Sequence, residues 1–168
     1  MADIKHGRGK GLKDKTFFYT QPEMVKDLLN LIPFKEGDKV LDAGSGKNKV
    51  WFNNLPECVK KYECEIDDGC NFLNWDIPVD WVVGNPPFHL GNEFIQHSAS
   101  ICKVGFAFLL SIRSFNSLTP NRLEQLKQKG FYLSKIHIVN DKRWYGRYYF
   151  VIFTRDKNLF LTWKLKTY

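Results

Sequence analysis

The sequence has few cysteines, and no two of them have the spacing of a zinc or redox motif. The four cysteines are Cys58, Cys64, Cys70 and Cys102. Without a C-x-x-C pair, neither a zinc knuckle nor a thioredoxin-like redox site is indicated. A metal site that would add His89 or His97 to these cysteines is disfavoured, because zinc-ligand pairs usually lie much closer together in sequence. We therefore predict reduced thiols that act as core or strand residues, and no metal centre.

The chain also lacks an export signal and a membrane-spanning segment. Residues 1–5 contain no apolar stretch of the kind that a signal peptide needs. The longest apolar run, around residues 104–110, is far shorter than the roughly 20 residues that cross a bilayer. The sequence therefore predicts a protein that is not exported and that has no membrane partner.

The glycine-rich stretch of residues 42–46, Asp-Ala-Gly-Ser-Gly, lacks the pattern of a phosphate-binding P-loop. That motif needs a glycine where Leu41 stands and a serine or threonine where Asn48 stands. ATP hydrolysis is therefore disfavoured. The stretch instead follows a predicted strand, and its glycines permit close backbone approach to a ligand. Many strand-to-helix turns are rich in glycine for steric reasons alone, so this turn does not identify a ligand by itself.

The chain does have enough apolar residues for one domain, and it carries a surplus of positive charge. Of its 168 residues, 43% are apolar, which suffices for a core of ordinary size. The 25 Lys and Arg residues outnumber the 18 Asp and Glu residues, and the surplus gathers at the two ends of the chain. The composition of residues 1–15 predicts a flexible basic arm, and that of residues 16–168 predicts a single domain. The charge suits a polyanionic partner, and it is equally typical of a solubilising surface.

Three stretches carry the start signals of helices. Thr20 and Glu23 form a capping box that predicts a helix over residues 21–32. Asn92 is expected to cap a second helix. A third helix is predicted over residues 120–130, because a threonine cap and a proline open it and a glycine closes it.

Short apolar segments between these helices predict the strands of a sheet. The predicted strands cover residues 39–42, 61–66, 71–73, 80–84, 106–112, 133–139 and 148–154. The run over 106–112 is the most apolar and is expected at the centre of the sheet. Strands that alternate with helices predict an α/β sheet covered on both faces, with a ligand site at the carboxyl ends of the strands.

Asn85-Pro86-Pro87-Phe88 is the most informative motif of the chain. Two consecutive prolines remove two backbone donors and force an extended path. The side-chain oxygen of Asn85 and the backbone carbonyl of Pro86 can then accept both hydrogens of an exocyclic amine, while the Phe88 ring offers a face for a nucleobase to stack on. A proline turn that merely ends a strand is the alternative.

Glu65 stands at the end of a predicted strand, about twenty residues after the glycine turn. An acidic side chain in this place can accept hydrogen bonds from ribose hydroxyl groups. Asp67 and Asp68 lie nearby, but Glu65 is favoured because it is nearest to the end of the strand.

The order of these motifs resembles that of the class I S-adenosylmethionine-dependent adenine-N6 methyltransferases of nucleic acid, such as the DNA adenine methylases. The resemblance begins with Tyr-Thr-Gln-Pro at residues 19–22 and ends with the Asn-Pro-Pro-Phe motif at 85–88, and it covers most of the chain beyond the arm. The Asn-Pro-Pro-aromatic motif is specific, whereas all class I methyltransferases share the glycine turn. The resemblance implies a Rossmann-like, mostly parallel sheet whose last strands include an antiparallel one.

The resemblance implies S-adenosylmethionine as the cofactor. Six residues would lie along its methionine part, its backbone and its amino group: Tyr19, Thr20, Pro22, Asp42, Gly44 and Gly46. Glu65 would bind the ribose, and Phe72 would pack on the adenine. Asn71 stands where the family usually has Asp, and its carbonyl oxygen would accept from the adenine amine. For Phe72 ordinary core packing is the alternative.

The resemblance also implies methyl transfer to the N6 amine of adenine. The catalytic residues would be Asn85, Pro86, Pro87 and Phe88. Protein-glutamine and guanine-N2 methyltransferases carry a similar motif, typically with Tyr at the Phe88 position and with extra domains. A catalytically silent nucleic-acid-binding subunit with the same fold is a further alternative.

Nucleic acid is the implied partner, and the resemblance favours DNA over RNA. The chain has no room for a separate target-recognition domain, so recognition would fall to the basic arm, a basic loop or a separate targeting protein. The candidate contacts to the nucleic-acid strand are Arg113, Arg143, Trp144 and Arg147. Such a protein would act in the cytoplasm, or in the nucleoid or nucleus with its substrate.

Overall fold

The computed structural model describes residues 20–139 and 147–157 of the 168-residue chain. The predicted basic arm, Tyr19, Arg143 and Trp144 lie outside the described residues. Among the described residues, no helix is both long and apolar enough to cross a membrane.

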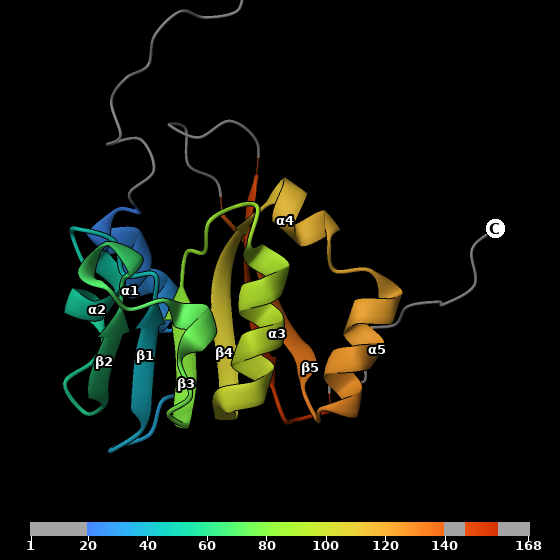
Figure 1. Cartoon of the computed structure of the whole chain (residues 1–168), viewed down its shortest axis with the longest axis horizontal. Helices are drawn as coiled ribbons and strands as arrows, with labels where there is room; N and C mark the ends of the chain where they lie inside the picture. Colours follow the sequence, from blue (N-terminus) through green and yellow to red (C-terminus); the bar gives the residue numbers. More distant parts are fainter. Residues whose placement is uncertain (1–19, 140–146, 158–168) are drawn as a thin grey trace, which may run out of the picture.

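A six-stranded sheet with the order β2-β1-β3-β4-β6-β5 organises the described residues (Figure 1). Its strands are β1 (Lys39–Ala43), β2 (Lys60–Cys64), β3 (Val79–Gly84), β4 (Cys102–Ser111), β5 (Tyr132–Val139) and β6 (Tyr148–Thr154). The pairs β1–β2, β1–β3 and β3–β4 are parallel, whereas β6 runs antiparallel to both of its neighbours, β4 and β5. The predicted α/β class, with a mostly parallel sheet and an antiparallel strand near the end, is confirmed.

Helices cover both faces of this sheet. They are α1 (Pro22–Leu29), α2 (Val50–Asn54), α3 (Gly91–Ile101), α4 (Ile112–Asn116) and α5 (Pro120–Gln128), with two 3-10 helices, η2 (Ile66–Asp68) and η3 (Phe72–Asn74). One core cluster joins the sheet to α3 and α5, which lie in front of it in Figure 1, and the other joins it to α1 and α2. The order of the elements thus produces the two-faced α/β layering that the alternation predicts.

Strand β4 lies in the middle of the sheet, as its apolar sequence predicts. Phe106 and Phe108 belong to the core cluster on the α3 side, and Ala107 and Leu109 belong to the cluster on the α1 side. Successive side chains of a strand point to opposite faces, so the stretch of a strand that two helical layers cover is apolar on both faces.

Two predicted helix caps are wrong. Helix α1 begins at Pro22 with Gln21 as its N-cap, so Thr20 lies one residue outside and makes no capping bond. The fixed φ angle of proline suits the first helical position and moves the start of the helix along the chain. Helix α3 begins at Gly91, because the bond from Leu90 N to Pro87 O turns the chain directly into the helix. Asn92 therefore lies inside the helix and does not cap it.

The predicted strand over residues 71–73 is also wrong. The side chain of Asn71 accepts a hydrogen bond from Leu73 N at 3.0 Å and thereby starts the 3-10 helix η3. Strand β2 ends at Cys64, two residues before its predicted end, because the Glu65 carboxylate accepts a bond from Asp67 N and starts η2. Both errors have one cause, since a short polar or acidic side chain that bonds its own backbone competes with strand pairing. The third predicted helix is confirmed, because Thr119 caps α5.

Candidate functional site

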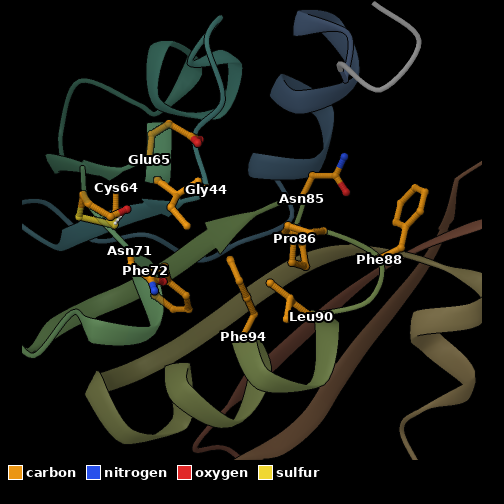
Figure 2. A pocket seen from close by; sticks show the side chains of 13 residues that line it. Gly44, Cys64, Glu65, Asn71, Phe72, Asn85, Pro86, Phe88, Leu90 and Phe94 are labelled. Atoms are coloured by element: carbon orange, nitrogen blue, oxygen red, sulfur yellow. Dashed lines mark hydrogen bonds between the residues drawn. A yellow bond between two sulfur atoms is a disulfide. The ribbon is translucent and has the colours of Figure 1, made fainter. Parts of the chain in front are cut away.

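A pocket of about 320 Å³ lies where the chain leaves β1, β2 and β3 (Figure 2). The residues that line it are Gly44, Cys64, Glu65, Ile66, Cys70, Asn71, Phe72, Asn85, Pro86, Pro87, Phe88, Leu90 and Phe94. Its volume falls within the range of small-molecule sites, which is roughly 300–1,000 Å³. The predicted ligand site at the carboxyl ends of the strands therefore corresponds to a formed pocket.

The structure brings most of the predicted site residues together at this pocket. Eight of them line it: Gly44, Glu65, Asn71, Phe72, Asn85, Pro86, Pro87 and Phe88. Thr20, Asp42 and Gly46 are not among the lining residues. Thr20 and Gly46 bond the lining residues Asn85 and Glu65, and Asp42 precedes the lining residue Gly44 in the chain. Pro22, Arg113 and Arg147 are exposed and do not line the pocket.

The glycine turn after β1 is held against the end of β2. Gly44 and Gly46 have φ angles of 71° and 66°, which are left-handed conformations that glycine adopts without strain. The backbone N–H groups of Gly44 and Ser45 donate to the Cys64 carbonyl at 2.8 and 3.2 Å. Gly44 lines the pocket with backbone alone, so a ligand can approach the main chain closely.

Glu65 connects this turn to the pocket. One of its carboxylate oxygens accepts from Gly46 N at 2.6 Å, and the other accepts from Asp67 N at 3.3 Å. A carboxylate has about four lone-pair sites, so both oxygens retain acceptor capacity for a ligand. Glu65 thus both fixes the glycine turn and presents a charged acceptor to the pocket.

Asn85 extends from the end of β3 at a point of close backbone approach. The preceding Gly84 is required here, because a Cβ atom at this position would lie 2.7 Å from the Ala43 carbonyl oxygen. The Asn85 side-chain nitrogen donates to Thr20 Oγ1 at 3.5 Å. Its Oδ1 atom is buried and has no hydrogen-bond partner within residues 20–139 and 147–157. Asn85 therefore lines the pocket with an amide whose oxygen keeps no partner among the described residues.

Phe88 lies at the mouth of the pocket and is 38% exposed. Its carbonyl oxygen accepts a hydrogen bond from Ser114 Oγ at 2.9 Å. Its ring centroid lies 6.1 Å from that of Tyr148, with the two planes tilted by 52°. Figure 2 shows the Phe88 ring standing apart from the deeper Phe72 and Phe94 rings. Phe88 thus presents an aromatic face at the opening rather than in the core.

The deep end of the pocket is apolar. Phe72 packs against Phe94 with ring centroids 4.6 Å apart. Its ring is nearly perpendicular to that of His97, with centroids 5.0 Å apart. Phe72 belongs to the core and also lines the pocket, so its core packing is confirmed, while its contact with the cofactor's adenine stays a prediction. Phe94 and Leu90, which sequence reasoning missed as site residues, complete this wall from α3 and the turn before it.

Ile66 is a further lining residue that the sequence analysis missed. Its side chain is 66% exposed although it is apolar, and it directly follows Glu65. An apolar residue that follows the acidic end of a strand was the signal that could have identified it. An exposed apolar side chain at a pocket rim can cover a flat ligand ring and so shield it from water.

Asp42 is a buried carboxyl group in β1, close to the pocket segments. Its Oδ2 accepts from Phe52 N at 2.9 Å, while its buried Oδ1 has no partner among the residues that the structure describes. Burial raises the pKa of Asp42 from 3.8 to about 7, against the opposing effect of the Phe52 bond. The negative charges of Glu63 and Glu65 raise this pKa further.

We expect the free energy of unfolding to fall as the pH rises from about 4 to about 7. In this window the folded protein keeps a proton on Asp42 that the unfolded chain releases, so raising the pH favours unfolding by up to about 4 kcal/mol. Urea unfolding at a series of pH values measures this change. Asp42→Asn can still accept from Phe52 N and should flatten the profile over this window. An unchanged slope in Asp42→Asn would contradict the assignment.

Cys64 and Cys70 form a disulfide with their Cα atoms 5.2 Å apart. The predicted reduced state is therefore wrong for this pair. The 3-10 helix η2 turns the chain back on itself, and this fold-back brings two cysteines without a recognisable motif within bridging distance. Cys58 and Cys102 are free thiols, and burial raises the pKa of the Cys102 thiol. The disulfide closes the loop that carries Glu65.

Reduction of this disulfide is expected to lower the free energy of unfolding by about 2 kcal/mol, as chain-entropy arguments give for a loop of this length. Urea unfolding with and without a dithiol reductant measures the difference. A Cys64→Ser/Cys70→Ser variant should be insensitive to the reductant, and Cys58→Ser should respond as the wild type does. Equal sensitivity of the double variant and the wild type would contradict the prediction.

Solved structures share this fold, although no protein-family model and no curated protein matches the chain. TrmN from Thermus thermophilus is 19% identical with a TM-score of 0.56, and the match covers 79% of this chain and 48% of that chain. Magnesium protoporphyrin IX methyltransferase from Synechocystis PCC 6803, with bound SAH, is 11% identical with a TM-score of 0.60, and the match covers 80% of this chain and 83% of that chain. The 23S rRNA methyltransferase ErmE is 12% identical with a TM-score of 0.56, and the match covers 85% of this chain and 71% of that chain.

The chain has a class I methyltransferase fold. The matched part spans less than half of the TrmN chain. The predicted Rossmann-like arrangement is thereby confirmed, and the pocket at its strand ends is the candidate site.

Proposed function

We propose that this protein is an S-adenosylmethionine-dependent methyltransferase that methylates the N6 amine of adenine in nucleic acid, with DNA as the favoured substrate. The observation that carries the proposal is the Oδ1 atom of Asn85, a buried acceptor without a partner among the described residues, on a residue that lines the pocket. A buried polar atom without a partner costs about 1–3 kcal/mol. A donor amine in the pocket would remove this cost.

The residues of the pocket fit the proposed cofactor. Glu65 offers a charged acceptor for ribose hydroxyl groups, and Gly44 leaves the main chain open to close approach. Phe72 and Ile66 supply apolar surface for a flat ring. The bound SAH in the magnesium protoporphyrin IX methyltransferase of the same fold supports the same class of cofactor here. When bound, S-adenosylmethionine supplies the electrophilic methyl group of its sulfonium.

The Asn-Pro-Pro-Phe corner would act on the target base. Asn85 Oδ1 and the Pro86 carbonyl would accept the two hydrogens of the adenine amine, which draws the nitrogen lone pair out of the ring and makes it a better nucleophile. These acceptors favour the charge that develops on the nitrogen in the transition state. Phe88 would stack on the extruded base and replace lost stacking worth about 1–3 kcal/mol per base.

Two exposed arginines support a nucleic-acid partner. Arg113 lies in α4 just after β4, and Arg147 directly precedes β6. Because Ser111 pairs with Tyr148, both arginines lie at the end of the sheet that carries Phe88. Exposed arginines beside a pocket mouth can bind phosphate groups. The fold shared with a 23S rRNA methyltransferase keeps RNA as the alternative substrate.

A methyl-transfer assay tests the proposal. The full-length chain is incubated with methyl-labelled S-adenosylmethionine and a panel of single- and double-stranded DNA and RNA, and the nucleosides are then separated. We expect label in N6-methyldeoxyadenosine. Label in N6-methyladenosine of RNA would make RNA the substrate. Label in a guanine derivative, or in glutamine of an added protein, would contradict the adenine assignment.

Calorimetry with S-adenosylmethionine separates an enzyme from a silent subunit. Cofactor binding without transfer to any polynucleotide would contradict the proposed substrate class. Failure to bind the cofactor would favour the catalytically silent nucleic-acid-binding subunit.

A further inference from the structure

The Asn85–Phe88 corner is held at both ends by buried hydroxyl groups from distant parts of the chain. Thr20, which precedes α1, accepts a hydrogen bond from the Asn85 side-chain nitrogen at 3.5 Å. Ser114, in α4, donates a hydrogen bond to the Phe88 carbonyl at 2.9 Å. Thr20 is 5% exposed and Ser114 is 4% exposed, so water competes little for either bond.

The Thr20 bond concerns the orientation of an amide. An asparagine side chain has a donor end and an acceptor end, and only the acceptor end can bind the hydrogens of a target amine. With the nitrogen of Asn85 directed to Thr20 Oγ1, the oxygen is the end that keeps no partner among the described residues. Loss of the Thr20 hydroxyl would allow the amide to rotate and present its nitrogen instead.

The Ser114 bond concerns the position of a ring. Ser114 packs tightly against the start of α3, since a Cβ atom on Gly91 would lie 3.1 Å from Ser114 Cβ. Ser111 caps α4 by accepting from Ser114 N, which fixes Ser114 at the end of β4. The carbonyl that Ser114 binds belongs to Phe88 itself, so α4 sets the place of the exposed Phe88 ring at the pocket mouth.

We propose that Thr20 and Ser114 are positioning residues of the target-base site, in which Thr20 orients the Asn85 amide and Ser114 fixes the Phe88 ring. This inference rests on the proposed function. The two residues act on different steps, because the Asn85 oxygen contributes to the chemical step while the Phe88 ring contributes to capture of the base. Their loss therefore has different kinetic consequences.

Steady-state kinetics with the oligonucleotide that the methyl-transfer assay labels tests this division. Thr20→Val keeps the shape but removes the acceptor, and we expect kcat to fall about tenfold with an unchanged KM for the oligonucleotide. Ser114→Ala should raise that KM about tenfold and leave kcat within twofold. Thr20→Ser keeps the hydroxyl group, and this variant should have the wild-type kcat. Ser117→Ala is the matched control in the same region, since Ser117 Oγ bonds only the Ser114 carbonyl among the contacts described, and it should leave both parameters unchanged.

A readout independent of activity accompanies the kinetics. The side-chain amide protons of Asn85, followed by NMR, should exchange with solvent faster in Thr20→Val than in the wild type or in Thr20→Ser. Thermal unfolding, measured on every variant, identifies a variant that has lost its fold, and the Kd for S-adenosylmethionine shows whether a variant has lost the cofactor contact that the resemblance implies for Thr20. If Thr20→Val does not fold, Thr20→Ala is measured against Thr20→Ser in its place.

The outcomes separate this inference from the proposed function. An active wild type whose kcat and KM are unchanged in Thr20→Val and Ser114→Ala would overturn the inference alone. A fall of kcat together with a rise of KM by the same factor in both variants would also overturn it. That result indicates a general loosening of the pocket, in which the two residues do not act on separate steps. A wild type that binds S-adenosylmethionine but labels no polynucleotide would overturn both.

Discussion

Asn85→Ala is expected to lower kcat for adenine methylation by at least about 100-fold, the order of loss seen when one preorganised transition-state contact is removed. The substitution removes the unpartnered Oδ1 that would accept from the target amine. The Kd for S-adenosylmethionine should change by less than about twofold, because the cofactor contacts are assigned to other residues. Single-turnover methylation and calorimetry measure the two quantities.

Asn92→Ala is a matched control for this prediction. Asn92 also has a buried side-chain oxygen without a partner in the described part of the chain, but it lies in α3 and does not line the pocket. It should therefore retain wild-type kcat. Methylation by Asn85→Ala at the wild-type rate would contradict the proposed role of the Asn85–Phe88 corner, whatever the Kd for S-adenosylmethionine.

Glu65→Ala is expected to raise the Kd for S-adenosylmethionine about 100-fold. The charged carboxylate would accept from ribose hydroxyl groups, and each hydrogen bond to a charged group contributes about 1.5–3 kcal/mol. The variant also loses the bond from Gly46 N, which holds the glycine turn against the pocket. Titration calorimetry with the cofactor alone measures the effect without any nucleic acid.

Glu63→Gln distinguishes a ribose contact from a general loss of negative charge. Glu63 lies two residues earlier in β2 and pairs with Lys49 at 2.5 Å, and it does not line the pocket. Its variant should bind the cofactor within about threefold of the wild type, the order of effect of a partly exposed ion pair at the surface. Similar losses in both variants would mean that the charge of β2, rather than a contact of Glu65, determines affinity.

The sheet could be predicted because its strands are encoded locally. Residues 106–110 are apolar at every position, a pattern that is typical of a strand buried on both faces. The boundaries of β6 agree with the predicted range 148–154, since it ends in a polar segment. Conversely, the strand predicted over 71–73 does not exist, because the bond from Leu73 N to Asn71 starts a 3-10 helix that propensity alone does not reveal.

The candidate site was predictable to the extent that its residues follow strand ends. Gly44, Glu65 and Asn85 each come after a different strand, and parallel strands bring their carboxyl ends to the same edge of the sheet. Leu90 and Phe94 were missed because an apolar residue has no pattern that separates a pocket wall from a core. The roles assigned to the predicted residues stay predictions until the variants are measured.

The sequence by itself determined the order of the elements, the class of the fold and the motif that turns the chain after β3, because periodicity, glycine and proline act over a few residues. Only the tertiary structure decided that Cys64 bonds Cys70, that Thr20 meets Asn85 across 65 residues and that Ser114 reaches the Phe88 carbonyl. Such contacts depend on how the chain packs in three dimensions, and hydroxyl groups that are ordinary in sequence acquire a partner only when packing brings them to one.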